Sequence, residues 1–139
     1  MPQPPDDLDA VAVRTWCSLA LEALGRERRA IDAINVFPVA DGDTGTNLYL
    51  TVESAAAAVE AVFAAHETGT TTPTPADAVR AMAHGALIGA RGNSGTILAQ
   101  LLRGMAGVLA EAGDADHLRG ALTEAAAAAR QAVAHPVEG

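Results

Sequence analysis

Two aspartates separated by one glycine are the residues of this sequence best suited to chemistry. Asp41 and Asp43 flank Gly42, and because glycine adopts positive φ at little cost, a curled chain can turn both carboxylates toward one point. Such a pair suits a hard divalent cation, and Mg²⁺ completes its octahedral shell with water and phosphate oxygens. The alternative is an ordinary turn with Asp43 or Thr44 capping the helix that follows. An EF-hand is disfavoured because Val52 stands where its bidentate acid belongs.

The residues directly after the acidic pair predict an anion site. Thr44, Gly45, Thr46 and Asn47 lead into a segment with helical apolar spacing. The first N–H groups of a helix have no intrahelical acceptor and lie at the positive end of its dipole, so they can receive phosphate oxygens. The sequence thus indicates a metal site and a phosphate site side by side.

A second glycine-rich run, GARGNSG at residues 89–95, also precedes a helix. Gly92, Asn93, Ser94 and Gly95 would offer N–H groups and small polar side chains to a diphosphate, and Arg91 would add a cation. The glycines are spaced by three and no strand precedes them, so this is not the GxGxxG of a dinucleotide fold. A plain helix-breaking turn, with Arg91 solvated at a helix end, is the alternative.

Composition removes several classes of function. The 139 residues suit one domain, the formal net charge is −8, and all nine basic residues other than histidine are arginine. The absence of lysine excludes a Walker P-loop, Schiff-base chemistry and a lysine base, and the acidic balance argues against nucleic acid as a partner. Cys17 has no disulfide partner and is expected to be a small buried residue.

The elements that must position these runs are all predicted to be helices. Gly25 is expected to end the first helix and Pro38 to bar continuation of the second. The segments 36–45 and 66–75 are expected to be a loop and a surface connection, and no alternating strand pattern is found. The predicted helices span residues 8–24, 26–35, 46–65, 76–88, 96–112 and 116–134.

Neither a leader peptide nor a membrane span is expected from the sequence. The first residues, MPQPPDD, lack a basic and an apolar region, and no apolar run approaches the roughly 18 residues a span needs. We therefore expect a cytoplasmic protein. Four histidines lie away from the acidic pair in sequence and are expected to be solvated or packed rather than catalytic: His66, His84, His117 and His135.

Two segments carry a resemblance to a known family. Residues 34–50, INVFPVADGDTGTNLYL, and 84–98, HGALIGARGNSGTIL, closely resemble the DhaL (DAK2) domain, in particular the amino-terminal domain of bacterial fatty acid kinase. The resemblance extends over essentially the whole chain and implies an all-α barrel of antiparallel helices that binds ATP and magnesium among the loops at one end. The residues it implies for magnesium are Asp41 and Asp43, with Asn35 the nearest candidate for a third ligand. Those it implies for the phosphates are Thr44, Thr46, Asn47, Asn93 and Ser94.

The function implied by the resemblance is that of an ATP-dependent phosphotransferase domain. Its substrate would be a fatty acid presented by a separate, DegV-like fatty-acid-binding protein, and no side chain of this chain is assigned as a catalytic base. A dihydroxyacetone kinase subunit is disfavoured, because that branch usually carries histidine where Thr44 stands and lacks the VFPV segment. A non-catalytic nucleotide- or lipid-binding module and a purely structural bundle remain as alternatives.

The last residues, HPVEG at 135–139, resemble a turn that leads into further helices in the family. The domain at residues 1–139 is therefore expected to be incomplete at its carboxyl end. The helices at residues 94–134 are then expected to expose apolar faces, which would favour a homodimer.

Overall fold

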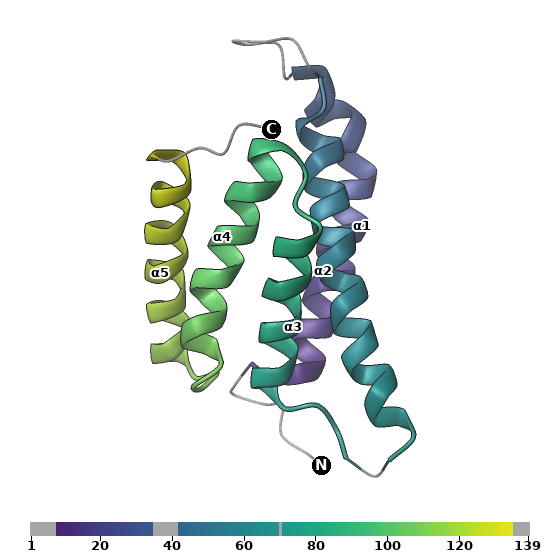
Figure 1. Ribbon diagram of the computed structural model, residues 1–139, viewed down its shortest axis with the longest axis vertical. Helices are drawn as coiled ribbons and strands as arrows, with labels where there is room; N and C mark the ends of the chain where they lie inside the picture. The colour runs from purple at the N-terminus through teal and green to yellow at the C-terminus, as the bar shows by residue number, and fades with distance from the viewer. Residues whose placement is uncertain (1–7, 35–41, 70, 135–139) are drawn as a thin grey trace.

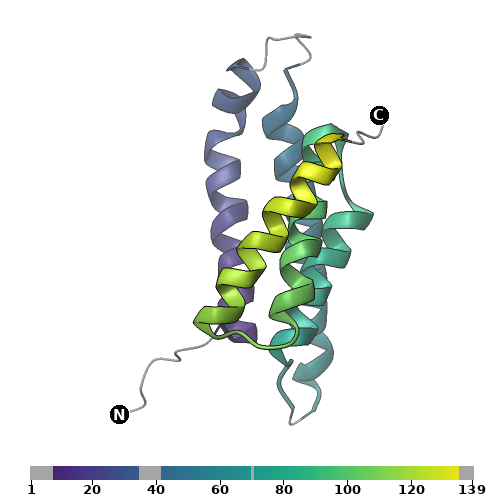
Figure 2. The same ribbon diagram turned by 90° about the vertical axis from the view of Figure 1, so that its left-hand side faces the viewer.

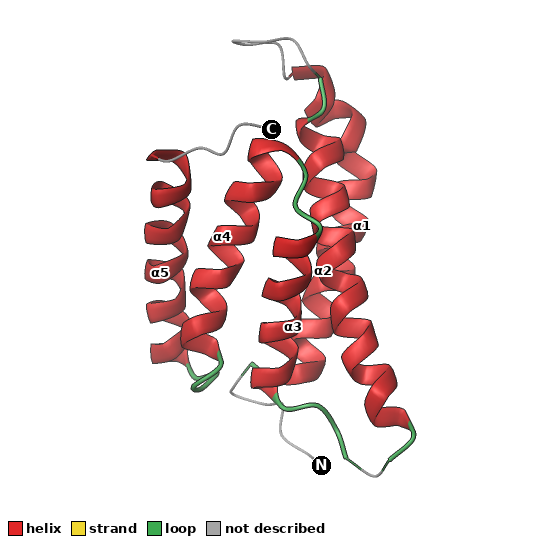
Figure 3. Cartoon of the chain, in the orientation of Figure 1, coloured by secondary structure: helices red, strands yellow, loops and turns green. Residues whose placement is uncertain are grey.

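Five helices make up the part of the chain that the structure describes, residues 8–34, 42–69 and 71–134 of a computed structural model (Figures 1 and 3). No strand occurs in these ranges, so the predicted all-α class is confirmed. Successive helices run in opposite directions (Figure 1). Their bounds are α1 Ala10–Ile34, α2 Thr44–Glu67, α3 Pro75–Ile88, α4 Gly92–Leu109 and α5 Ala115–Ala134.

Small side chains let these helices pack closely. The core consists mainly of alanine, valine and leucine from α1 to α4, and Cys17 is buried in it as expected. Where α2 meets α3, a Cβ on Gly85 would lie 2.6 Å from the Cβ of Ala58, closer than two such atoms can approach. Ala55 and Ala58 of α2 thus form part of the surface on which α3 packs.

Helix α2 contacts α1, α3 and α4, and α3 and α4 likewise each contact three other helices. Among the described helices, α2 alone is long and apolar enough to cross a membrane by length and composition. Core helices of soluble proteins pass the same test. Of that apolar stretch of α2, 28% is buried in the structure.

The predicted break at Gly25 was wrong, because α1 runs without interruption from Ala10 to Ile34. Gly25 keeps negative φ, whereas a glycine that ends a helix usually adopts positive φ. A Cβ at Gly25 would lie 3.4 Å from Cε2 of Tyr49, so this glycine packs against α2. The two helices predicted at residues 8–24 and 26–35 are thus one.

The glycine-rich run at residues 89–95 is only partly a loop, which corrects the predicted start of the next helix at residue 96. Its second half forms the first turn of α4, which begins at Gly92 with φ +65°. The hydroxyl of Thr96 donates to the carbonyl of Gly92 over 3.0 Å within this turn. Likewise α2 begins at Thr44, two residues before its predicted start.

The outermost helix, α5, packs against α4 and against no other helix (Figures 1 and 2). Its Leu122 and Val133 are 57% and 60% exposed, which agrees with the apolar exposure expected for this region. The large apolar side chains of α4, in contrast, are buried or partly buried. Trp16 of α1 is 46% exposed and lines an apolar groove of about 160 Å³ with Leu118 and Met105.

Candidate functional site

The two glycine-rich runs singled out in the sequence meet at one end of the bundle. Helices α2 and α4 both begin there (Figure 1). A Cβ on Gly92 would lie 2.5 Å from Nδ2 of Asn47, so the first turn of α4 lies directly against α2. One helical turn further along α2, the hydroxyl of Thr51 accepts a hydrogen bond of 3.1 Å from the backbone N–H of Arg91. The predicted adjacency of the two runs therefore exists in the fold.

The first turn of α2 is held by a carboxylate from α1. Asp32 accepts the backbone N–H of Thr46 at Oδ1 over 3.0 Å and the hydroxyl of Thr46 at Oδ2 over 2.7 Å. Nε of Arg28 donates to the same hydroxyl over 3.0 Å. These hydrogen bonds, the side-chain one first, hold the pKa of the Asp32 carboxyl below its usual range. Asp32 therefore supplies the negative charge that a helix amino terminus attracts.

Sequence reasoning missed Asp32, although a signal was present. An acidic residue in the last turn of a helix faces the negative end of the dipole and is disfavoured there. A carboxylate in that position needs a partner elsewhere in the fold. The partner is Thr46, fourteen residues further along the chain.

Gly45 allows this contact between α1 and α2. It is buried, and a Cβ there would lie 3.0 Å from the Cβ of Ile31 and would overlap the carbonyl oxygen of Arg28. Its backbone N–H also approaches Asp32 and contributes to the lowered pKa of that carboxyl. Two of the N–H groups predicted to receive phosphate at α2 therefore already face a carboxylate.

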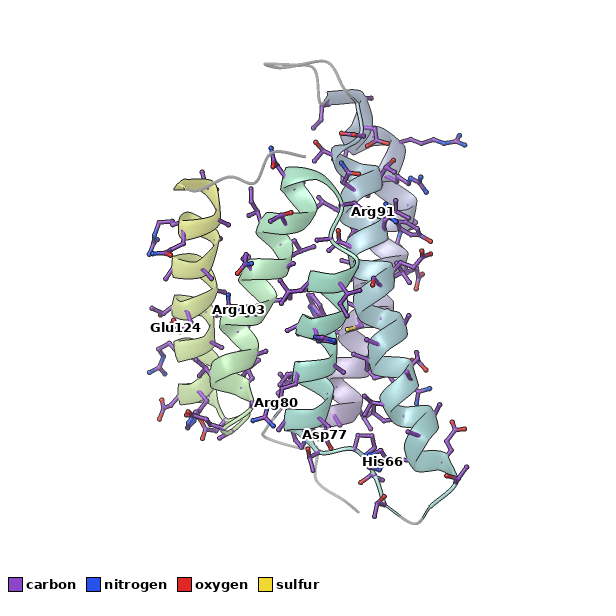
Figure 4. The ribbon with its side chains drawn as sticks, in the orientation of Figure 1. His66, Asp77, Arg80, Arg91, Arg103 and Glu124 are labelled. Atoms are coloured by element: carbon purple, nitrogen blue, oxygen red, sulfur yellow. The ribbon has the colours of Figure 1, made fainter. Side chains whose placement is uncertain are left out.

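The amino terminus of α4, in contrast, is open. Arg91 stands at the N-cap position without a side-chain capping hydrogen bond, and the first turn carries no acidic residue. Gly92 and Asn93 are exposed and Ser94 is partly exposed, so the N–H groups of this turn face solvent. Figure 4 shows Arg91 at the connection between α3 and α4, beside α2. Of the two helix starts, α4 is the better anion site.

Asp43 lies at the N-cap position of α2, but its carboxylate does not cap the helix. Only its carbonyl takes part, accepting the N–H of Asn47 over 2.8 Å. The side chain is exposed, and Gly42 before it has φ +62°, the curled conformation expected for the loop. The predicted metal ligands Asp41 and Asn35 lie outside the described residues. Within the described ranges, no three His, Cys, Asp or Glu side chains gather as a metal site.

None of the histidines that the structure describes contacts this site: two lie beside residues in other parts of the fold, and the third is exposed. His66 is at the opposite end of the molecule, near Asp77 and Arg80 (Figure 4), with its Nδ1 2.9 Å from the hydroxyl of Thr71. Nδ1 of His117 lies 2.9 Å from a carboxylate oxygen of Asp114 in the turn before α5. His84 is exposed on α3, and His135 lies outside the described residues.

Comparisons with known proteins find sequences similar to this chain. The model of the DAK2 domain family matches residues 38–139. Protein YloV of Bacillus subtilis is 39% identical over 131 residues, which are 91% of this chain and 22% of that protein. An uncharacterized protein of Staphylococcus haemolyticus is 37% identical over 111 residues, 78% of this chain and 19% of its own length. The chain thus spans about a fifth of the length of these relatives.

Proposed function

The chain belongs to the DAK2 domain family, and we propose that it is the Mg²⁺–ATP-binding part of a cytoplasmic phosphotransferase. The observation that carries this proposal is the open amino terminus of α4, which lies against the first turn of α2 at Asn47, while the N-cap carboxylate of α2 caps nothing. The first turn of α4 offers the N–H groups of Gly92, Asn93 and Ser94, which have no intrahelical acceptor. Asp43, at the start of the neighbouring α2, is exposed. An anion site beside a carboxylate fits a phosphate chain with its cation.

The donor set at this end fits the proposed ligands. Asp43, together with Asp41 and Asn35, would hold Mg²⁺, whose charge offsets that of the phosphates during transfer. The backbone of the first turn of α4 would bind phosphate oxygens. The side chains that this proposal assigns to the phosphates are those of Thr44, Asn47, Asn93 and Ser94, with the backbone of Gly92. The backbone N–H groups of Gly45 and Gly95 already face Asp32 and the carbonyl of Arg91.

Among the residues that the sequence predicts for the phosphates, the structure favours unequal contributions. The N–H and hydroxyl of Thr46 already bind Asp32, so Thr46 would hold the geometry of α2 rather than a phosphate. Asn47 lies against Gly92, between the two helix starts. It is therefore the side chain of α2 best placed to reach a phosphate bound at α4.

For the acceptor, we propose a fatty acid presented by a separate, DegV-like fatty-acid-binding protein. An oxygen of its carboxylate would form a bond to the γ-phosphorus while the bond from that phosphorus to the bridging oxygen breaks, leaving ADP with the electron pair. The products are ADP and an acyl phosphate. The resemblance of residues 34–50 and 84–98 to fatty acid kinase supports this choice over a dihydroxyacetone kinase-type activity. A non-catalytic nucleotide-binding module is the second candidate, because the chain spans only a fifth of its relatives.

Calorimetric titration with ATP tests the nucleotide site. In Mg²⁺ the protein is expected to bind ATP, and EDTA or the double substitution Asp41→Asn, Asp43→Asn is expected to weaken binding at least about tenfold. Asp116→Asn on exposed α5 is the matched control and should leave the affinity unchanged. ATP binding that is unchanged by EDTA and by the double substitution would overturn the magnesium assignment.

The fatty acid assignment needs a separate measurement. Hydroxylamine traps acyl phosphates as hydroxamates, which can be followed after adding ATP, Mg²⁺ and an acyl-loaded carrier protein. Hydroxamate formation that depends on Asp43 would support an acyl kinase. Nucleotide binding without any hydroxamate would favour the non-catalytic module.

A further inference from the structure

One face of α2 carries a row of polar side chains that follows the connection between α3 and α4. Its members, spaced by four and then by three residues, are Asn47, Thr51 and Ser54. This spacing places them on one side of a helix. Each of them contacts the glycine-rich run at residues 89–95, and Thr51 is the most deeply buried of the three.

The side chain of Thr51 is 0% exposed, and among the described residues it is the one buried polar side chain. A buried hydroxyl is unfavourable unless it forms hydrogen bonds. The hydroxyl of Thr51 donates to the carbonyl of Asn47 over 2.8 Å, one turn back along α2. It also accepts the backbone N–H of Arg91, which lies beside α2 (Figure 4), over 3.1 Å. One hydroxyl thus joins the first turn of α2 to the N-cap residue of α4.

The N–H of Arg91 depends on an acceptor outside α4. The N-cap residue precedes the helix, so its N–H has no intrahelical partner and must find one elsewhere. The carbonyl of Arg91 accepts the N–H of Gly95 over 3.0 Å, which closes the first turn of α4. Thr51 therefore holds the residue from which this turn starts.

The other end of the same turn also rests on Thr51. Gly95 is buried, and a Cβ there would overlap Oγ1 of Thr51. The open N–H groups of Gly92, Asn93 and Ser94 lie between these two points of contact. Thr51 therefore fixes, from beneath, the direction in which these N–H groups face.

Packing alone does not require threonine at this position. The neighbouring buried side chains of α2 include Val52, Ala55 and Val59, all apolar. Valine at position 51 would have nearly the same shape as threonine, but it could neither donate to Asn47 nor accept from Arg91. What threonine adds over valine is the pair of hydrogen bonds.

We propose that Thr51 is a positioning residue of the nucleotide site, which holds the first turn of α4 in the conformation that binds phosphate. This inference rests on the proposed function, because that function places the phosphates at this turn. Thr51 is buried and acts through the N–H groups of α4 rather than by touching the ligand. Donors that are already in place bind an anion more tightly than donors that become ordered on binding.

Calorimetric titration of two Thr51 variants with Mg²⁺–ATP tests this role. Thr51→Val removes both hydrogen bonds at nearly constant volume and is expected to weaken ATP binding about tenfold. Thr51→Ser keeps the hydroxyl but loses a buried methyl group, so the melting temperature should fall while the ATP affinity stays close to that of the original protein. A role in stability alone predicts instead that neither variant changes the affinity of the folded protein.

Thr123→Val is the matched control for the loss of a hydroxyl. The hydroxyl of Thr123 donates to the carbonyl of Arg119 over 3.2 Å, four residues back along α5, and the residue is exposed. The substitution removes the same kind of local hydrogen bond far from the start of α4. ATP affinity should therefore be unchanged in Thr123→Val.

Hydrogen exchange of the Arg91 amide, followed by nuclear magnetic resonance, measures the contact without nucleotide. This amide is expected to be protected in the original protein and in Thr51→Ser, and to exchange faster in Thr51→Val. An Arg91 amide that exchanges as fast as in an unfolded chain in the original protein would overturn the inference. That measurement needs no variant, so it stands even if Thr51→Val does not fold.

The outcomes of the titration separate this inference from the proposed function. ATP affinity that is unchanged in Thr51→Val, or that is lost equally in Thr51→Val and Thr51→Ser, would overturn the role of the hydroxyl while the nucleotide site stands. If the original protein binds no Mg²⁺–ATP although its Arg91 amide is protected by Thr51, the proposed function itself fails.

Discussion

At the scale of the residue, Asp32 shows how one side chain can connect two helices. A carboxylate near the end of α1 lies close to unpaired backbone carbonyls, which is unfavourable. The start of α2 offers the opposite environment, and Asp32 reaches it through Thr46. Because Arg28 holds the same hydroxyl, the three residues fix α2 against α1 where the proposed site begins.

Replacing Asp32 by alanine is expected to lower the melting temperature by several degrees at neutral pH, because α2 loses its cap. The sign of the pH dependence follows from the lowered pKa of Asp32. A carboxyl with a depressed folded pKa contributes stability above its ordinary pKa of 3.8 and loses it as the pH falls through the folded value. The difference in melting temperature between the original protein and Asp32→Ala should therefore become smaller below pH 3.8. Thermal unfolding at a series of pH values measures it.

Asp116→Ala is the control for that measurement. Asp116 is exposed, and its only ion pair among the described residues is with Arg119, three positions along the same helix. Exposed pairs of this kind contribute little to stability. A melting difference for Asp32→Ala that stays constant from pH 7 to pH 3 would contradict the capping role.

At the scale of the element, apolar spacing predicted the helices well, but the glycines led to wrong predictions of where the helices begin and end. The spacing of Val13 and Cys17, or of Val52, Ala55 and Val59, is helical, and each of these side chains is buried. Gly25 was expected to stop a helix on local grounds, yet it continues α1 because Tyr49 of α2 packs over it. Such a contact comes from a distant segment, so local sequence patterns do not contain it.

The two glycine-rich runs illustrate the same limit at the proposed site. Their positions before helices were predictable, and so was the curled Gly42. The capping of α2 by Asp32 and the contact of Asn47 with Gly92 depend on how α1, α2 and α4 pack. Sequence therefore identified which segments form the site, while packing decided which of their N–H groups remain open.

Alanine substitutions at two glycines separate packing from backbone strain. Gly25→Ala is expected to stabilise the protein by about 0.5–1 kcal/mol, because the new methyl group makes ordinary contact with Tyr49 in a helix interior. Gly92→Ala is expected to destabilise it by about 1–2 kcal/mol or more, because φ is +65° there and the methyl group would press on Asn47. Chemical denaturation of both variants gives the two free energies of unfolding.

The pair of variants also tests the architecture. Destabilisation by Gly25→Ala would indicate that residue 25 ends a helix after all, with positive φ. If Gly92→Ala leaves the free energy of unfolding unchanged, the first turn of α4 can shift away from Asn47. In that case the close contact of the two helix starts would not be required by the fold.

At the scale of the whole molecule, the helices are held unequally. Helices α2, α3 and α4 each pack against three others, whereas α5 packs only against α4 (Figure 2). Gly104 lets these two approach closely, since a Cβ there would lie 2.7 Å from the carbonyl oxygen of Glu124. The remaining side of α5 leaves Leu118 and Leu122 exposed.

This asymmetry predicts the order in which the helices open. Local unfolding needs less free energy where fewer apolar contacts must be broken, so amide hydrogens of α5 are expected to exchange fastest among the five helices. Those of α2 and α3 around Val59 and Val79, both 1% exposed, should exchange slowest. Hydrogen–deuterium exchange with peptide-level mass spectrometry measures this order. If the amides of α5 are instead as well protected as those of α2, and this protection is lost when the protein is diluted, a second copy covers the face containing Leu118 and Leu122.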